Sequence, residues 1–268
     1  MGIISERLKN ARIEKGFCVI CGAFGLLSKD HVPPRCATTI QPMLQKTVSE
    51  YFSANDVIPI NAIRGAVFKT ICKNCNGNIL GALDSEIKNP VHFFLDEIKK
   101  YLTGYYYNNI IKVPFKVEPF LKAMIGHLLA ATSVESCKNK PIDSDFYTPL
   151  RQFVLGENKD ITLSHDFYYW FYPKKIQITS QLISFYNDGH ICLCSCMHFF
   201  PIAFLVTLKK EGTYPAQANK IALSDKNLYF DMSTSNLDYS SFPFGPLNGN
   251  KMMLFASGYT CVSYPQNK

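Results

Sequence analysis

The chain has 268 residues, of which 47% are apolar and 13% aromatic, and its formal net charge is +7. These proportions exclude a disordered chain and allow one large or two smaller globular domains. The charge suits an anionic partner such as a nucleic acid without demanding one. No apolar run approaches the roughly 18 residues of a membrane span, so we expect no membrane segment and a cytoplasmic location.

The first segment is predicted to be a short surface helix. Residues 5–15 can form it, with Ser5 as the N-terminal cap and Gly16 closing it. We assign residues 1–16 to this helix. Its basic residues could line a phosphate track, but a solvated helix face explains them equally well.

Two strands and a helix are predicted within the next segment, residues 17–88. Residues 26–32 are expected to form a strand that ends at the following prolines, because proline cannot donate a hydrogen bond to a sheet. A second strand is predicted at residues 66–71, and a helix at residues 74–87. The connection at residues 36–64 has no clear period and could be a lid, a substrate-contacting insertion or a loop with a helical turn near residues 42–52.

The dipeptide Asn89-Pro90 is predicted to break that helix and to mark a domain boundary. Residues 89–268 would then form a second, α+β domain. Its helices are expected first, at residues 91–102 and 119–136. Four strands of an antiparallel sheet are expected after them, at residues 161–172, 176–186, 190–196 and 199–208.

Two Cys-x-x-Cys pairs are the strongest motif in the chain. Zinc in structural sites takes four ligands at tetrahedral angles, and two such pairs supply four thiolates from two directions. Paired spacing in a chain without a predicted secretory segment favours a metal over disulfides. Four ordinary buried cysteines are the alternative. We expect structural zinc at Cys18, Cys21, Cys72 and Cys75.

Three residues near these pairs could carry chemistry. His31 is the only histidine between the two pairs, and a histidine, which titrates near pH 6.5, can take a proton from water as a general base. Asp30 offers a carboxylate oxygen and Asn76 an uncharged oxygen, which are ligands that Mg²⁺ or a similar ion accepts. An Asp-His dipeptide alone would more often be an ordinary strand end. The position of this dipeptide between the cysteine pairs favours a catalytic site instead.

The pattern Cys18-x-x-Cys21, Asp30-His31-Val32-x-Pro34, Cys72-x-x-Cys75-Asn76 resembles the HNH (ββα-metal) endonuclease superfamily in its four-cysteine form. It is similar to phage-type junction-resolving endonucleases and to bacterial stand-alone HNH proteins. The resemblance covers residues 17–88. It implies an α+β fold in which a ββα-metal, treble-clef-like zinc module precedes the α+β domain.

The resemblance also implies an activity, the hydrolysis of DNA phosphodiester bonds. His31 would be the general base, and Asp30 and Asn76 would hold a catalytic Mg²⁺ or Mn²⁺. Many bacterial proteins of this kind act in defence against phage, so we expect such a role. Residues 89–268 would recognise the substrate, a protein partner or a second copy of the chain.

Two positions depart from the family pattern. The last family position is often histidine, and here it is Asn76, which still offers an oxygen. The middle asparagine has no secure counterpart, and Asn55 and Asn61 are the candidates. Arg35 and Lys73 could contact phosphate, although exposed basic residues near a zinc site are common.

Three further features are given structural interpretations. Cys192, Cys194 and Cys196 alternate, which places their thiols on one face of a strand, and core packing is favoured over a second metal site. The aromatic run 167–172 is interpreted as a buried strand in preference to a base-stacking surface. His127 lies in an apolar helix and is interpreted as a core histidine.

Two other functions stay open at this point. A non-catalytic zinc module could bind nucleic acid or protein, although binding alone does not need the Asp30, His31 and Asn76 trio. RNA could also be the substrate of a nuclease, since the sequence does not distinguish it from DNA.

Overall fold

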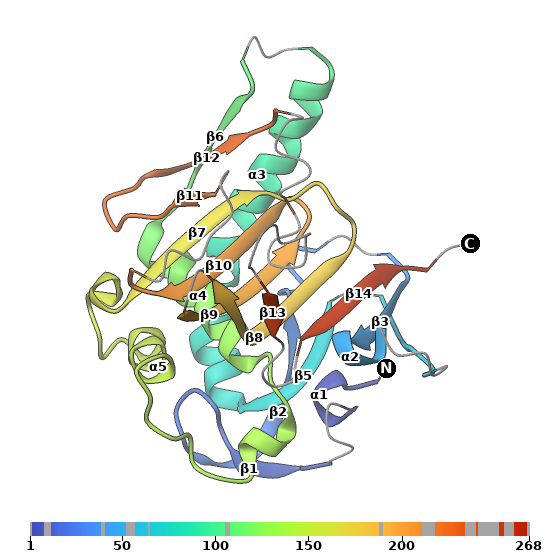
Figure 1. The fold of residues 1–268 in the computed structure, drawn as a ribbon, viewed down its shortest axis with the longest axis vertical. Coiled ribbons are helices and arrows are strands. Elements are labelled where there is room, and N and C mark those ends of the chain that lie inside the picture. Colours follow the sequence, from blue (N-terminus) through green and yellow to red (C-terminus); the bar gives the residue numbers. More distant parts are fainter. Residues whose placement is uncertain are drawn as a thin grey trace.

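The computed structural model describes residues 2–7, 12–38, 41–51, 57–63, 65–104, 108–187, 190–210, 218–233, 240, 252–254 and 260–266. Helices and antiparallel strands are mixed along the described chain, so the α+β class is confirmed (Figure 1). In the described part of the chain, no helix is long and apolar enough to cross a membrane.

A small three-stranded sheet carries the first cysteine pair. Its strands β1 (Lys15–Phe17), β2 (Phe24–Val32) and β5 (Ala66–Cys72) are ordered β1-β2-β5. The two strands predicted at residues 26–32 and 66–71 are therefore confirmed. They are antiparallel, and His31 lies opposite Val67.

The helix after β5 does not break at proline. A wide helical turn at Asn74–Leu80 leads through a 3-10 turn, Gly81–Leu83, into α3 (Asp84–Leu102), which includes Pro90. The predicted helix end at Asn89-Pro90 is therefore wrong. A proline inside a helix costs about 3 kcal/mol, but burial of one large apolar side chain returns about 1.5–3 kcal/mol. The buried apolar side chains of α3 are Ile87, Val91, Phe94 and Ile98.

The predicted N-terminal helix is much shorter than expected. Helix α1 covers only Ile4–Arg7, and residues 8–11 lie outside the described chain. Lys15 already belongs to β1, because this strand pairs with Phe24–Leu26 of β2 across the cysteine loop. The Arg7 guanidinium forms an ion pair with Glu50 (2.9 Å), so it is engaged within the protein.

The long connection at residues 36–64 contains two strands that the sequence analysis missed. After the loop come β3 (Met43–Thr47) and helix α2 (Val48–Tyr51), and β4 (Ile60–Ala62) follows. Only the helical turn was expected. Strand β3 pairs with β4 on one side and with a C-terminal strand on the other, so this connection belongs to the large sheet.

The large sheet has nine strands in the described chain. Its order is β11-β7-β10-β9-β8-β14-β3-β4, with β13 also paired to β8. The four predicted strands are confirmed, with shifted ends. Residues 161–163 form a 3-10 turn before the first of them. The C-terminal strands are β7 (His165–Phe171), β8 (Gln177–Asn187), β9 (His190–Phe199), β10 (Ile202–Leu208), β11 (Asn219–Lys220), β13 (Met252–Leu254) and β14 (Cys261–Pro265).

Helix α4 (Val117–Ala130) connects the two sheets. It packs against β2 and β5 on one side and against β8 and β9 on the other. The Thr70 hydroxyl donates to the carbonyl of Ala130 (2.6 Å), and the Gln181 amide donates to that of Leu129 (2.7 Å). The predicted buried helix at residues 119–136 is therefore confirmed in its first part.

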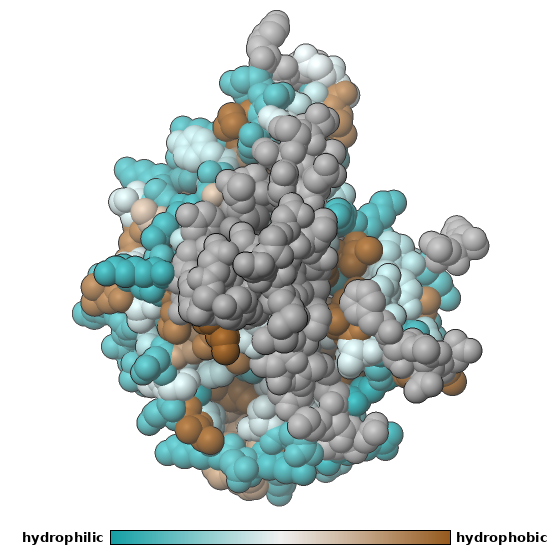
Figure 2. Space-filling view, viewed as in Figure 1, coloured by the Kyte–Doolittle hydropathy of each residue, from teal (hydrophilic) through white to brown (hydrophobic). Residues whose placement is uncertain are grey.

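The remaining elements are a 3-10 turn (Val134–Cys137), helix α5 (Tyr147–Leu155), and the pair of β6 (Ile110–Pro114) with β12 (Asn227–Asp231). A large apolar cluster runs through α3, α4 and the sheets, and a second, smaller cluster lies on β7, β8, β9 and β10 of the large sheet. Figure 2 shows hydrophilic and smaller apolar patches interspersed on the described part of one face. The division at residues 88–89 stays a prediction, although it cuts α3 and separates β3 from its partner strand β14.

Candidate metal centre and catalytic site

The four paired cysteines converge on one point. Their sulfur atoms all lie within 4.8 Å of one another, and the Cys21 and Cys72 sulfurs are 3.8 Å apart. Zinc with four sulfurs at about 2.3 Å and tetrahedral angles requires neighbouring sulfurs about 3.8 Å apart. The predicted ligand set is confirmed as a cluster that can hold a metal such as zinc. In the described residues, no other group of three or more Cys, His, Asp or Glu lies this close together.

Two tight turns bring the sulfurs together. In the first, the Gly22 N–H donates to the carbonyl of Cys18 (2.8 Å), and Gly22 has a φ of +70°, which glycine adopts without strain. The Cys18 N–H donates to the carbonyl of Ala23 (2.9 Å). In the second, the Cys75 N–H points at the sulfur of Cys72 (3.4 Å). Each turn thus directs its two thiols toward the two thiols of the other turn.

The thiols of this cluster hold protons unequally. A hydrogen bond from the Cys75 thiol lowers the pKa of Cys18 to about 5, and the same bond raises the pKa of Cys75. Burial raises the pKa of Cys21 to about 11. A metal binds thiolates, so zinc would release these protons on binding.

Asp30 is buried, and each of its two carboxylate oxygens has one hydrogen-bond partner within the protein. Its carboxylate oxygen Oδ1 accepts the N–H of His31 (2.9 Å), and Oδ2 lies 2.9 Å from Nδ1 of His127. The residue is 5% exposed. An ionised carboxylate has about four acceptor sites, so two hydrogen bonds leave room for a further ligand bond.

Asn76 is fixed against the strand that carries Asp30. Its amide nitrogen donates to the Ser28 hydroxyl and to the carbonyl of Lys29 (2.8 Å), the residue before Asp30. Both amide hydrogens are used in this way. The oxygen Oδ1 is therefore the atom that the side chain can offer to a cation, and its role as a metal ligand stays a prediction.

His31 lies in β2 directly after Asp30 and is half-buried. Side chains of successive residues in a strand point to opposite faces, so the imidazole and the Asp30 carboxylate diverge from the backbone. The role of His31 as a base stays a prediction.

Two residues near Asp30 were not predicted to belong to the site. His127, interpreted as a core histidine, is buried as expected but contacts Asp30, and its Nε2 lies 3.8 Å from Oδ1 of Asp84. Burial alone would lower the pKa of His127, but the Asp30 and Asp84 carboxylates together outweigh burial and raise this pKa to about 9. The only indication in the sequence was a single histidine in an apolar helix. It did not identify Asp30, 97 residues away, as the partner of that histidine.

The structure places the residues predicted to assist Asp30, His31 and Asn76 in different environments. Arg35 and Lys73 are both exposed, so either can meet a phosphate, and this contact stays a prediction. Asn61 lies in β4, next to β3 in the large sheet, and Asn55 lies outside the described residues. The middle asparagine of the family pattern is therefore not identified.

The structural interpretations of the C-terminal motifs are confirmed. Cys192, Cys194 and Cys196 are fully buried in an apolar cluster. Residues 167–170 of the aromatic run are buried in β7, Phe171 is partly exposed, and Tyr172, just past the strand, is buried.

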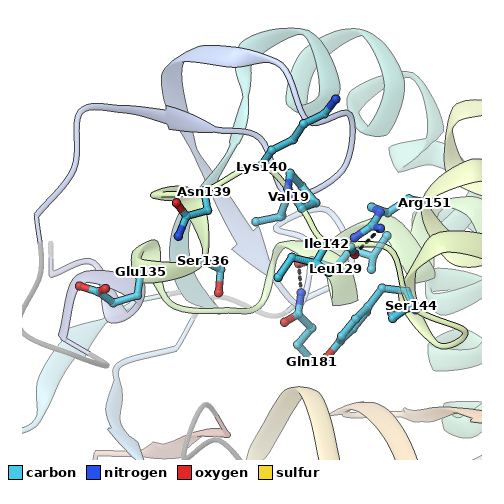
Figure 3. Close-up of a pocket in the computed structure, with 12 residues that line it drawn as sticks. Val19, Leu129, Glu135, Ser136, Asn139, Lys140, Ile142, Ser144, Arg151 and Gln181 are labelled. Carbon is cyan, nitrogen blue, oxygen red and sulfur yellow. Dashed lines mark hydrogen bonds between the residues drawn. The ribbon is translucent and has the colours of Figure 1, made fainter.

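A cavity of about 410 Å³ lies beside the first cysteine turn and is lined largely by residues from the segment 135–151 (Figure 3). Two of its polar side chains are already engaged by backbone carbonyls. Arg151 donates to Ile142 (2.8 Å) and Gln181 to Leu129 (2.7 Å). None of the three predicted catalytic residues lines this cavity, so it is separate from the candidate site.

Comparisons of the chain with family models, with curated proteins and with solved structures find no match in any of the three.

Proposed function

We propose that the chain is a metal-dependent endonuclease of the HNH type that hydrolyses DNA phosphodiester bonds. The observation that carries this proposal is the contact between Asn76 and the backbone beside Asp30. It supports a site in which the Asp30 carboxylate of β2 and the Asn76 amide oxygen of the helical turn after β5 bind the same ion. The cysteine cluster supports the same arrangement, because Cys72 and Cys75 flank the junction between β5 and that turn.

In this proposal the side chains have separate tasks. His31 accepts a proton from the attacking water, a role that typically contributes about 10²–10⁴-fold to a rate. Asp30 and Asn76 hold the divalent ion through oxygen, and their remaining acceptor sites fit that role. When bound, Mg²⁺ or Mn²⁺ polarises the scissile phosphate and stabilises the leaving oxygen. Exposed Arg35 and Lys73 contact neighbouring phosphates.

The cellular setting belongs to the same proposal. We place the enzyme in the cytoplasm, in defence against phage, with residues 89–268 recognising a substrate, a protein partner or a second copy of the chain.

A second candidate is a non-catalytic, zinc-stapled module that binds nucleic acid or protein. One observation favours it: both Asp30 oxygens accept hydrogen bonds within the protein, as a purely structural carboxylate would. A nuclease that cuts RNA is a third candidate, since the same residues would serve either backbone.

A nicking assay on supercoiled plasmid, with Mg²⁺ or Mn²⁺, separates these functions. We expect His31→Ala to lower the cleavage rate by about 10²–10⁴-fold while circular dichroism shows a retained fold. His92→Ala removes an exposed imidazole from α3 and serves as the matched control, with a rate within a few-fold of wild type. Labelled single-stranded DNA and RNA identify the preferred substrate. If the wild-type protein binds these nucleic acids but cuts none, the binding module replaces the nuclease.

A further inference from the structure

His127 reaches the candidate site from a distant part of the chain. Helix α4 packs so closely against the helical turn at Asn74–Leu80 that a Cβ at Gly126 would overlap the Leu80 side chain. The neighbouring residue is His127. Glycine at this position therefore allows the approach that sets the imidazole beside β2.

The imidazole and the Asp30 carboxylate form a buried pair. Nδ1 of His127 and Oδ2 of Asp30 are 2.9 Å apart, and the two residues are 2% and 5% exposed. An ionised carboxylate can only accept, so Nδ1 is the donor. Leaving either partner alone at this depth would be costly, because a buried charge or polar group needs a partner.

The second ring nitrogen has a different environment. In the described chain Nε2 is buried without a hydrogen-bond partner, and the nearest carboxylate oxygen recorded for it, Oδ1 of Asp84, is 3.8 Å away. That distance is too long for a hydrogen bond. The ring is therefore fixed by its Nδ1 bond and by the packing of α4.

We propose that His127 is the positioning residue of the metal-binding carboxylate, which rests on the function proposed above. Asp30 has two orientation-fixing bonds: the His31 N–H holds Oδ1, and the His127 ring holds Oδ2. Carboxylate ligands of metals are commonly oriented by such outer hydrogen bonds, and losing one typically lowers metal affinity or activity by about 10–100-fold. His127 need not touch substrate or ion. It acts through Asp30.

Three substitutions distinguish positioning from simple packing. His127→Asn keeps an amide N–H near the position of Nδ1, whereas His127→Gln carries its donor farther out, toward the position of Nε2. His165→Gln is the control, because His165 is an equally buried histidine in β7 of the large sheet. Each zinc-loaded variant is assayed for cleavage rate across a Mn²⁺ titration, and for its melting temperature.

We expect His127→Gln to require about 10–100-fold more Mn²⁺ for half-maximal rate. His127→Asn should stay within a few-fold of wild type, and His165→Gln should melt earlier without changing the Mn²⁺ requirement. Equal Mn²⁺ requirements in all four proteins would overturn the positioning role and leave the nuclease intact.

If the wild-type protein cuts nothing, the proposed function fails, and direct Mn²⁺ binding by calorimetry still decides the role of His127. Binding that is lost in both Asp30→Asn and His127→Gln but kept in His127→Asn supports positioning. Mn²⁺ binding that is unchanged by these substitutions, or no Mn²⁺ binding by the wild-type protein, overturns the positioning role.

Discussion

The cysteines of the small sheet and those of the large sheet differ in arrangement and in burial. In the first, four sulfurs approach within 4.8 Å of one another from two turns. In the second, the thiols of β9 lie along one face of the strand, packed among apolar residues such as Trp170 and Ile183. A cysteine count does not separate these cases. Convergence of the sulfurs does.

The buried histidines of the two regions differ in the same way. His127 faces the Asp30 carboxylate and lies near that of Asp84, and the two together raise its pKa to about 9 against the effect of burial. The ring of His198 in β9 contacts the rings of Trp170 and Tyr172, and burial lowers its pKa to about 3. In the described chain neither ring nitrogen of His198 has a hydrogen-bond partner. The partner, and not the depth, decides whether a buried imidazole carries charge.

The largest expected effect comes from removing a thiol of the cluster. Structural zinc contributes on the order of 10 kcal/mol to folding, so Cys72→Ala should abolish metal binding and lower the melting temperature sharply. Cys194→Ala removes a thiol of similar size from an apolar core and should cost only about 1–2 kcal/mol. Metal content by mass spectrometry and calorimetric melting, with and without a chelator, measure both. Equal losses in the two variants, or a wild-type protein indifferent to the chelator, would remove the distinction between the two cysteine groups.

A smaller effect is expected from acid. An unfolded histidine titrates near 6.5, and the folded pKa of His198 is about 3, so the unfolded state binds more protons between these values. The stability contributed by neutral, buried His198 is therefore fully present above pH 6.5 and is lost as the pH drops through this window, by about 1.4 kcal/mol per pH unit. Burial lowers the pKa of His165 to about 4, so His165 also makes the protein less stable as the pH falls, over a narrower pH range.

His198→Phe should flatten this pH dependence, because it removes one of the two histidines whose pKa is lowered by burial. Denaturant unfolding between pH 4 and pH 7 measures the slope. A variant with the wild-type slope would mean that folding does not lower the pKa of His198.

The smallest effect concerns the exposed basic residues of the site. If Arg35 and Lys73 each contact one phosphate, each alanine variant should reduce the slope of log affinity against log salt by about 0.7–0.9. Lys159→Ala makes the same charge change in the loop after α5 and serves as the control. Binding to a short DNA duplex at several salt concentrations is the measurement. A change of slope as large in the control would assign the effect to net charge alone.

Local pattern was sufficient for the parts of the site that are close in sequence. Cysteine spacing predicted the cluster, and proline placement predicted the end of the strand that carries His31. The contact of Asp30 with His127 could not be predicted, because it depends on how α4 packs across the small sheet. Without that packing, the histidine is one polar residue on an apolar helix.

Two errors in the fold have a common physical cause. The sequence rule that proline ends a helix failed at Pro90, where burial of one face of α3 outweighs the lost hydrogen bond. The loop predicted at residues 36–64 contains β3, whose pairing with β14 joins residues more than 200 positions apart. In both cases tertiary contacts override a correct local preference.

Strands β3 and β4 come from the N-terminal part of the chain but belong to the large sheet, which limits where the chain can be cut into two stable fragments. A chain shortened to residue 88 would keep the four paired cysteines and the Asp-His pair but would lose β14, which pairs with β3, and most of α3. Apolar surface from both elements would then meet water. We expect such a fragment to aggregate, and separating a cutting half from a recognising half would require a break elsewhere in the chain.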